Sequence, residues 1–419
     1  MKLVWRNIWR NRRRAVITMA SVFFATFFSV IMMSFNEGTW EKMIENTLRT
    51  QTGHIQIHGR NYWDDKVVDN FMTIDAETIA QLEDIDNVEN VSPRIETFAL
   101  AASGTISKGI AVCGVSPEKE KQKSNLPLRL VQGVYLTETD DGILLGEGLG
   151  KYLRAGIGDT IALIGQGYQG SSAAQLFVVR GILQLMTPEM DNSMAYITLP
   201  ATQQFIDMPD GYSGILISIK NNNLLYETMQ HIRDRLNLIQ YPQSESDTHL
   251  LSIDFETSSF VVYSWHFTME RLLQSSESDK AFSKILMYVL YIIVGFGILG
   301  TIIMMTNERR REFCMMISLG MSRIRLAAII AVEQIIMSLL GVVFALAVSL
   351  PVTYRFTEHP IPMTGEMADT FLQFGMEPVL PMSVQPFIFT NQMTIILVIA
   401  LLAVIYPVNK ILKLRIANK

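Results

Sequence analysis

Four long apolar stretches interrupt an otherwise polar sequence. They cover residues 15–35, 285–306, 326–350 and 387–408, and Glu333 is the one charged side chain that they contain. A helix of about 20 apolar residues crosses the roughly 30 Å hydrocarbon core of a bilayer. The pattern therefore predicts four transmembrane helices.

The first stretch is longer than the apolar part of a cleaved signal peptide, which is usually about 7–15 residues. The sequence SFNEGTW that follows also lacks a small-residue cleavage site. We therefore expect the stretch to remain as a membrane anchor.

Residues 36–284, between the first two stretches, follow a different pattern. Apolar and polar residues alternate in GHIQIHG, DTIALIG and AQLFVVRGIL, as is typical of strands, whereas DAETIAQLEDI has the period of a helix. We expect a large mixed α+β domain outside the membrane. Residues 351–386 hold six of the fourteen prolines and are expected to form an ordered cap or a semi-rigid loop.

The distribution of charge orients these parts. The chain has 419 residues, 18% charged residues and a formal net charge of −5. Residues 1–14 carry six Lys or Arg and residues 409–419 carry four, and neither segment has an acid. Residues 307–325 carry five Lys or Arg and two Glu. By contrast, residues 36–284 carry 19 basic and 33 acidic side chains. Because short basic segments stay in the cytoplasm, both termini and residues 307–325 are predicted to be cytoplasmic. The acidic domain is predicted to lie outside, and its charge argues against a nucleic-acid partner.

Residues 1–14 have the pattern of an amphipathic helix lying on the membrane. Trp5 and Trp9 fall on one face, and Arg6, Arg10 and Arg13 fall on another. Tryptophan favours the headgroup level and arginine favours the anionic inner leaflet. We expect an elbow helix at the cytoplasmic surface.

The loop 307–325 is predicted to contain a short amphipathic helix. Its apolar stripe consists of Phe313, Met316, Ile317 and Gly320, opposite Arg310 and Arg311. Gly320 is expected to end this helix and Ser322 to cap the next one. A simple basic loop would not need the stripe, so we interpret the helix as a docking element for a cytoplasmic partner.

Glu333 lies about one third of the way into the third apolar stretch, counted from its cytoplasmic end. An ionisable residue in a membrane helix is costly and marks a candidate functional site. A hydrogen bond between helices or a side chain reaching toward the interface would also account for it. Both interpretations stay open.

Motifs for catalysis are weak. Gly165, Gly167 and Gly170 fit G-x-G-x-x-G, but they lie between two strand patterns, which predicts a hairpin loop. His54 and His58 lie within a strand pattern, which predicts a same-face pair rather than a zinc site. The sequence shows no nucleophile motif, so we expect no enzyme active site, cofactor or metal in this chain.

Several of these features together resemble a known family. The run from Glu308 to Phe313, followed by Ile317 to Arg323, resembles the coupling-helix signature of ABC-transporter permeases of the FtsX/MacB/Lol superfamily. The pair Tyr406-Pro407, the opening Arg6–Arg14 and an acid at Glu333 resemble other family features, as does the order of one span, a large outer domain and three spans. The chain is most similar to the lipoprotein-releasing (LolC/LolE-type) permeases.

The resemblance implies a function and partners. A separate cytoplasmic ATPase dimer, which binds ATP and Mg, would move two permease subunits, identical or paralogous, in the inner membrane of a bacterium. The coupling residues would be Glu308, Arg309, Arg310, Glu312, Phe313, Ile317 and Gly320. The outer domain would be a MacB-like periplasmic core with a Porter part interrupted by a Sabre part.

The substrate implied by the resemblance is a lipoprotein, which would be released toward the periplasm and passed to a carrier protein. An apolar stripe on the first span, Phe24, Phe28, Ile31 and Phe35, could line its path. Lipid-facing or helix-packing roles also account for these residues, because Phe23 and Phe27 offer a rival face. Two alternative functions are a MacB-like efflux permease and an FtsX-like mechanotransmission subunit that controls a periplasmic partner.

Overall fold

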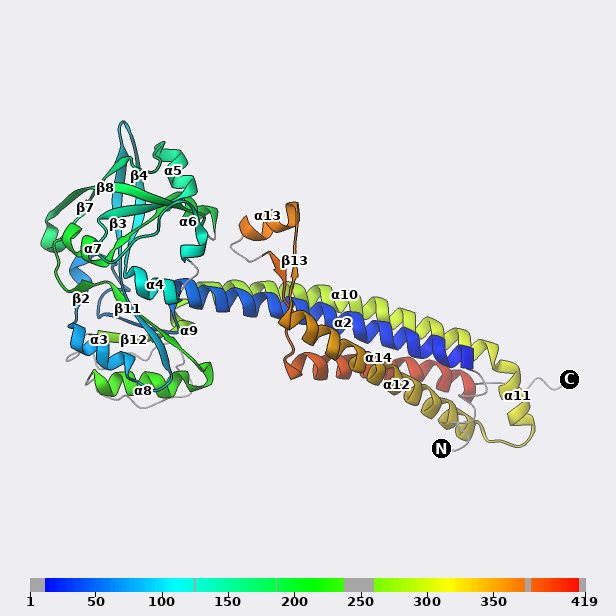
Figure 1. Cartoon of the computed structure of the whole chain (residues 1–419). Coiled ribbons are helices and arrows are strands. Elements are labelled where there is room, and N and C mark those ends of the chain that lie inside the picture. The colour runs from blue at the N-terminus through cyan, green and yellow to red at the C-terminus, as the bar shows by residue number, and fades with distance from the viewer. Residues whose placement is uncertain (1–11, 124–125, 186, 237–259, 374–377, 414–419) are drawn as a thin grey trace. The chain divides into compact units, whose positions relative to one another are not determined.

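The computed structural model describes residues 12–123, 126–185, 187–236, 260–373 and 378–413 (Figure 1). The chain divides into two compact units. One comprises Met1–Lys42, Ser275–Met363 and Val379–Lys419, and the other comprises Met43–Gln274 and Thr364–Pro378.

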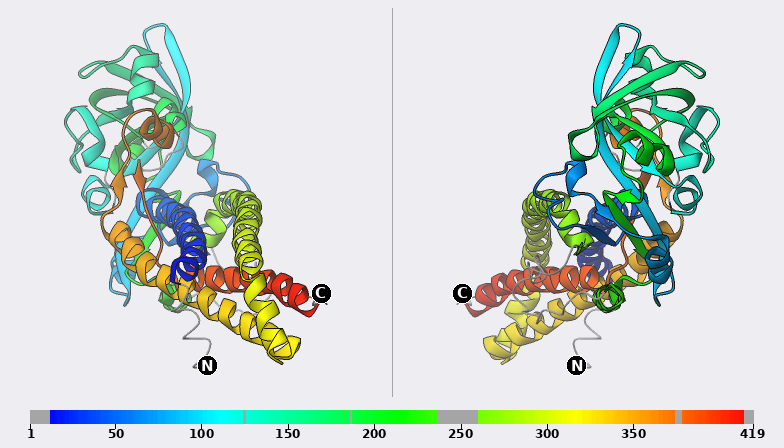
Figure 2. Two further views of the ribbon diagram at one scale, coloured as in Figure 1. Left: turned by 90° about the vertical axis from the view of Figure 1, so that its right-hand side faces the viewer. Right: turned by 90° about the vertical axis from the view of Figure 1, so that its left-hand side faces the viewer.

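The first unit is helical. Its helices are α2 (Arg12–Thr47), α10 (Glu270–Glu308), α11 (Arg310–Ser318), α12 (Arg323–Glu358) and α14 (Pro386–Leu412), and Figure 2 shows them from two further sides. Four of them, α2, α10, α12 and α14, are long and apolar enough to cross a membrane, which confirms the four predicted spans. Their shared core contains Val22, Ala25, Ile298, Ile302, Val342, Ile396 and Ala403.

The third long helix does not end where its proline suggests. Pro351 lies inside α12, which continues to Glu358, although the loop was expected to begin at residue 351. A proline inside a helix removes one backbone hydrogen bond of that helix. The helix continues here because the side chains of Ser349 and Thr353, on either side of the proline, are buried within the unit. Beyond the helix, β13 (Ile361–Pro362) pairs with β14 (Val379–Leu380), so the proline-rich segment contains ordered structure.

The segment before α14 is fastened to α2. The backbone N–H of Ser383 donates to the carbonyl of Ser34 at 3.0 Å, and the Ser34 hydroxyl donates to the carbonyl of Ser383 at 2.6 Å. Gly38 allows this close approach, because a Cβ there would lie 2.7 Å from the carbonyl carbon of Met382. The hydroxyl of Thr357 on α12 donates to the carbonyl of Met382 at 2.6 Å. This clamp joins α2, α12 and the start of α14.

The second unit is an α+β domain around a ten-stranded sheet. The strands of this sheet are β1 (Ile55–Gly59), β3 (Val88–Ser103), β4 (Ile106–Val115), β5 (Leu130–Gly133), β6 (Gly142–Gly146), β7 (Thr160–Gln166), β8 (Ser172–Leu183), β9 (Met194–Thr198), β11 (Gly214–Ile219) and β12 (Phe260–Ser264). A separate small sheet pairs β2 (Met72–Thr73) with β10 (Gly211–Tyr212). The helices of the unit are α3 (Ala76–Glu83), α4 (Pro117–Lys123), α5 (Glu147–Leu153), α6 (Pro188–Ser193), α7 (Leu199–Phe205), α8 (Leu225–Arg235), α9 (Trp265–Thr268) and α13 (Glu366–Gln373).

The predicted strand patterns correspond to β1, β7 and β8, and the predicted helix corresponds to α3. The three glycines of the G-x-G-x-x-G match lie at the connection between β7 and β8, which pair antiparallel. The hairpin prediction for this sequence is therefore confirmed. His58 lies in β1, where its ring is buried, and His54 immediately precedes that strand.

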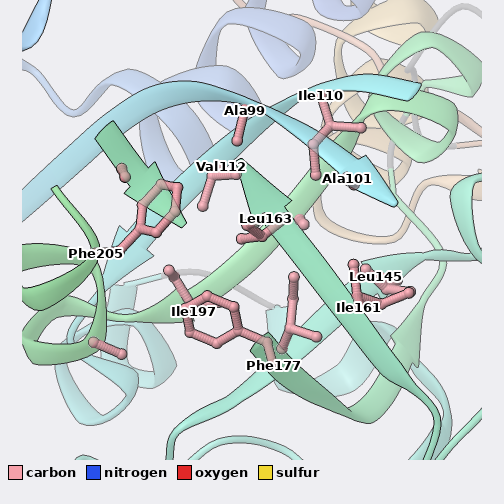
Figure 3. Packing of buried hydrophobic residues seen from close by; sticks show 14 of the residues in the cluster. Ala99, Ala101, Ile110, Val112, Leu145, Ile161, Leu163, Phe177, Ile197 and Phe205 are labelled. Carbon is pink, nitrogen blue, oxygen red and sulfur yellow. The ribbon is translucent and has the colours of Figure 1, made fainter. Parts of the chain in front are cut away.

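Six strands of the sheet close into a ring, because β3 pairs with β4 and β7, β8 pairs with β6 and β7, and β9 pairs with β4 and β6. Side chains from several strands meet inside the ring, as Figure 3 shows for Leu163, Phe177 and Ile197. Alternate residues of each strand point the other way. The outer side of the ring is therefore a separate surface.

A second core lies beside the ring. The strands β12, β1, β11 and β3 form an antiparallel wing. Ile55 and Ile217 of these strands pack with Leu82 of α3 and Ile232 of α8. Asp75 begins α3 by accepting a hydrogen bond from the backbone of Thr78. The strand β3 belongs to both the ring and the wing.

Candidate functional site

The short helix α11 and the turn after it form the first part of the candidate site. Gly320 adopts a φ of 97°, and its N–H donates to the carbonyl of Ile317 at 3.0 Å, while the N–H of Met321 donates to Met316 at 3.1 Å. This pair of bonds is a Schellman motif, in which glycine ends a helix. Ser322 then caps α12 by accepting from the backbone of Arg325. The predicted helix, its glycine end and its serine cap are confirmed.

The apolar stripe of α11 faces the interior of its own unit. Phe313 is 1% exposed and packs in one cluster with Leu326, Ile330 and Ile411 of α12 and α14. Ile317 is partly buried against the same cluster. Phe313 is therefore covered within its own unit, because the tight turn at Gly320 folds α11 back onto α12. Docking of α11 to a partner stays a prediction. The stripe anchors the helix.

A different apolar surface is open at this end of the unit. Leu319 is 82% exposed and Ile324 is 73% exposed, and Met315 is exposed one helical turn before Leu319. Arg310 and Arg311 are exposed beside them. We define Met315, Leu319 and Ile324 as the coupling face. The predicted stripe does not include this surface, although Met315 and Leu319, at i and i+4, indicate a second apolar side of the helix.

Behind the coupling face lies a buried ion pair. Arg309 occupies the single position between α10 and α11, and its Nη1 donates to both carboxylate oxygens of Glu333, at 2.9 and 3.0 Å. Both side chains are 3% exposed. The Nε of Arg309 also donates to Glu312 at 3.2 Å. Arg309, which was predicted as a contact for a partner, is instead buried because it binds Glu333.

The pair settles the position of Glu333. Its carboxylate, on α12, binds Arg309 at the junction of α10 and α11 in the same unit. Of the two interpretations of Glu333, a hydrogen bond between helices therefore describes its contacts. Removing one member of a buried ion pair costs roughly 3–5 kcal/mol, because the other charge is left without compensation. The pair therefore fixes α11 to α12, and we interpret its role as mechanical.

The end of α14 also reaches this region. The hydroxyl of Tyr406 lies 3.0 Å from the Nζ of Lys410, and Lys410 also contacts Asn307 at the end of α10. Pro407 is buried inside the helix. The Tyr-Pro pair thus lies where α10 and α14 meet. Glu308 and Arg310 are exposed at the adjoining chain positions.

The aromatic residues of the first span divide between two environments. Phe24 and Phe28 are exposed and border a cavity of about 250 Å³ between α2 and α10, together with Leu290 and Val294. Ile31 and Phe35 are partly buried. The predicted stripe is therefore continuous along the helix but not uniform in exposure. The elbow residues Trp5, Arg6, Trp9 and Arg10 lie outside the described residues, and Arg13 lies in the first turn of α2.

Known proteins share both parts of this chain. Residues 15–235 match the MacB-like periplasmic core domain, and residues 284–416 match the FtsX-like permease C-terminal region. The lipoprotein-releasing system transmembrane protein LolE of Haemophilus influenzae is 22% identical over 247 residues, which are 57% of this chain and 54% of that protein. The chain thus spans about half the length of this curated relative.

Two solved structures are similar to the chain. The periplasmic region of MacB from Actinobacillus actinomycetemcomitans has a TM-score of 0.38 and 15% identity, and the match covers 56% of this chain and 98% of that one. The extracellular domain of the noncanonic ABC-type transporter YknZ from Gram-positive bacteria has a TM-score of 0.33 and 13% identity, covering 43% and 94%.

Proposed function

Because this chain belongs to the family of permeases with a MacB-like periplasmic core domain and an FtsX-like C-terminal region, we propose that it is the membrane subunit of an ABC transporter. A separate ATPase dimer in the cytoplasm binds ATP and Mg and hydrolyses the nucleotide. This chain contributes no catalytic residue. It pairs with a second permease subunit in the inner membrane of a bacterium, with both termini in the cytoplasm.

The observation that carries the proposal is the coupling face. Leu319 and Ile324 are apolar and almost fully exposed beside two arginines. Exposed apolar side chains with a polar rim are typical of a surface that binds a protein. The face lies on a helix that Arg309 ties to Glu333. An ATPase bound to Leu319 would therefore move α11 and α12 together.

The substrate that the comparisons favour is a lipoprotein. One relative, 22% identical to this chain over 247 residues, is a lipoprotein-releasing system transmembrane protein. Burial contributes about 0.8 kcal/mol for each CH₂ group, so an acyl chain of about 16 carbons is held in the bilayer by roughly 12 kcal/mol. Extraction therefore needs the energy of ATP and a sheltered apolar route, and a soluble carrier would receive the product in the periplasm.

The test of the coupling face uses Leu319→Asp in the full chain, co-expressed with the ATPase. A charge in the centre of an apolar contact should lower co-purification of the ATPase and ATP-dependent release of lipoprotein by at least tenfold. Leu128→Asp is the matched control, since Leu128 is also exposed but lies in the α+β unit. Both variants should insert normally in the membrane.

Normal ATPase binding by Leu319→Asp would contradict the assignment of the coupling face. The identity of the cargo is tested separately, by mass spectrometry of material that co-purifies with the complex. Acylated protein supports lipoprotein release. A stoichiometric periplasmic hydrolase without acylated protein would favour mechanotransmission, and dependence on an outer-membrane channel would favour efflux.

A further inference from the structure

The first membrane helix joins the α+β unit through an unusual turn. The helix α2 runs to Thr47 and is followed by η1 (Leu48–Thr52), a π-helical turn in which the N–H of Gly53 donates to the carbonyl of Leu48 at 2.9 Å. Turns of this kind are rare and are frequent at functional sites. The chain belongs to the α+β unit from Met43 onward, so η1 is where the end of α2 meets the sheet.

The second membrane helix enters the same unit beside this turn. Trp265 begins α9, just before α10, and its N–H donates to the carbonyl of His54 at 2.9 Å. The two strands that meet here, β1 and β12, pair antiparallel. Leu48 of η1 packs in one cluster with Trp265 and Met269. The end of α2 and the start of α10 are therefore attached to the wing at one place.

A buried arginine reaches η1 from the sheet. Arg94 lies on β3, the strand shared by the ring and the wing, and its Nη1 donates to the carbonyl of Gln51 in η1 at 2.9 Å. The last carbonyls of a helix have no partner within that helix, so this bond supplies one from the sheet. The side chain of Arg94 is 6% exposed. The bond that fastens η1 to β3 is therefore shielded from water.

The same guanidinium also binds a carboxylate. The Nη2 of Arg94 donates to both carboxylate oxygens of Glu120, at 3.0 and 3.1 Å, and the side chain of Glu120 is 2% exposed. Glu120 lies on α4. Glu96, on the same strand as Arg94, lies 3.7 Å from Nη1 but is 53% exposed, so water can solvate it. One arginine thus joins three elements of the unit, η1, β3 and α4.

We propose that Arg94 is a positioning residue for release, which carries movement of the end of α2 into the α+β unit. The proposal rests on the proposed function and gives that function a joint. A shift of η1 displaces the carbonyl of Gln51, Arg94 moves β3 with it, and Glu120 makes α4 follow. A buried ion pair suits this role, because breaking it costs far more than breaking an exposed one. Since β3 belongs to both the wing and the ring, a single contact reaches both cores.

The test removes both buried charges together, because Arg94→Met alone would leave Glu120 buried without a counter-charge. The full chain is assembled with its ATPase in lipid nanodiscs, as wild type and as Arg94→Met with Glu120→Leu. The double variant should melt close to the wild type and hydrolyse ATP at the same rate. It should release at least fivefold less of a synthetic diacylated lipopeptide for each ATP hydrolysed. The matched control is Arg180→Met with Asp140→Leu, which removes an ion pair between β8 and the residues before β6 and should keep the wild-type ratio.

A distance measurement follows the joint without any cargo. Nitroxide labels are attached at Glu45→Cys on α2 and Lys108→Cys on β4, both at exposed positions of the α+β unit, in a chain that carries Cys113→Ala and Cys314→Ala. With Arg94 and its partner in place, the distance between the labels should be the same without nucleotide and with ATP and vanadate, because η1 and the sheet move as one body. In the double variant the distribution of this distance should at least double in width.

Two results overturn the proposal. An unchanged width in the double variant would show that η1 stays fixed without Arg94. A broadened distribution with undiminished release for each ATP would show that release does not need this joint.

If the double variant melts well below the wild type, Arg94→Lys decides by the same two measurements. It keeps a charge opposite Glu120 but loses the planar fork of donors, so it should show a smaller loss in the same direction, and wild-type values would overturn the proposal. Failure of the wild-type complex to release any lipopeptide would count against the proposed function, whereas the distance between the labels would still decide whether Arg94 fixes η1.

Discussion

The contact between Arg309 and Glu333 shows how a single pair of residues can position a helix. A guanidinium at a helix break and a carboxylate inside the next long helix are both 3% exposed and bind at 2.9 Å. Each charge is tolerated because the other is present. Nothing local in the sequence could predict this pairing, since the two residues are 24 positions apart. Predicting Glu333 as a functional candidate needed only its position in an apolar stretch.

The ion pair leads to a prediction for the stability of a single and a double variant. Glu333→Gln leaves the buried guanidinium without its counter-charge and should destabilise the protein by about 3 kcal/mol, which should lower the melting temperature of the full chain in nanodiscs by several degrees. The double variant Arg309→Met with Glu333→Leu removes both charges and should recover most of this loss. If the double variant melts as low as the single one, the pair has no compensating role.

His58 provides a second test at the residue scale, in the α+β unit. Its Nδ1 lies 2.7 Å from the carbonyl of Ser213, its Nε2 faces the amide of Gln56, and its ring stacks on Tyr62. Burial lowers the pKa of His58 from 6.5 to about 4, more than the hydrogen bond to Ser213 raises it. Between these pH values the unfolded chain binds more protons than the folded chain, so stability falls as the pH is lowered.

Unfolding of the full chain by guanidinium, followed by tryptophan fluorescence, should therefore show a loss of about 3 kcal/mol attributable to this ring between pH 6.5 and pH 4. His58→Gln should be less stable at neutral pH but should show a flatter dependence across the same range. An unaltered slope in His58→Gln would contradict the assignment.

Elements differ in how far local sequence determines them. The end of α11 and the start of α12 were predictable, because Gly320 and Ser322 act on their immediate neighbours. What covers the apolar stripe of α11 was not predictable, since Leu326 and Ile411 reach Phe313 from two other helices. The strands β7 and β8 were likewise predictable. The pairing of β3 with β7, which closes the ring, depends on contacts between residues 60 or more positions apart.

The clamp between α2 and the segment before α14 can be tested at Gly38. An added Cβ would lie 2.7 Å from the carbonyl carbon of Met382, and backbone cannot move aside as a side chain can. Gly38→Ala should therefore destabilise the helical unit by about 1–3 kcal/mol, measured as melting of the full chain in nanodiscs.

Gly300→Ala on α10 is the matched control, because no heavy atom lies within 4 Å of its added Cβ. Alanine favours a helix over glycine by up to about 1 kcal/mol, so this variant should be as stable as the wild type or slightly more stable. Equal stability of the two variants would show that the clamp is not tightly packed.

At the scale of the whole molecule, the charge distribution carried most of the information about organisation. The formal net charge of −5 hides opposed segments. Residues 1–14 carry +6, residues 307–325 carry +3 and residues 409–419 carry +4. Residues 36–284 carry −14, residues 351–392 carry −3 and Glu333 adds −1. The apolar stretches predicted the membrane helices, the alternating patterns within residues 36–284 predicted the α+β domain, and the uneven charge predicted the side of the membrane on which each part lies. The coupling face was not predicted, because it depends on which apolar residues the fold leaves uncovered.

The order of Arg309 and Glu333 along the chain bears on biogenesis. During synthesis Arg309 emerges before Glu333, at the end of the helix that precedes it. A carboxylate entering the bilayer alone costs about 2.5–3.5 kcal/mol on the scale of insertion by the translocon. Because Arg309 is synthesised first, its guanidinium is available as the counter-charge when α12 enters the bilayer. The order of the two residues is thus suited to insertion of α10 and α12 as one hairpin.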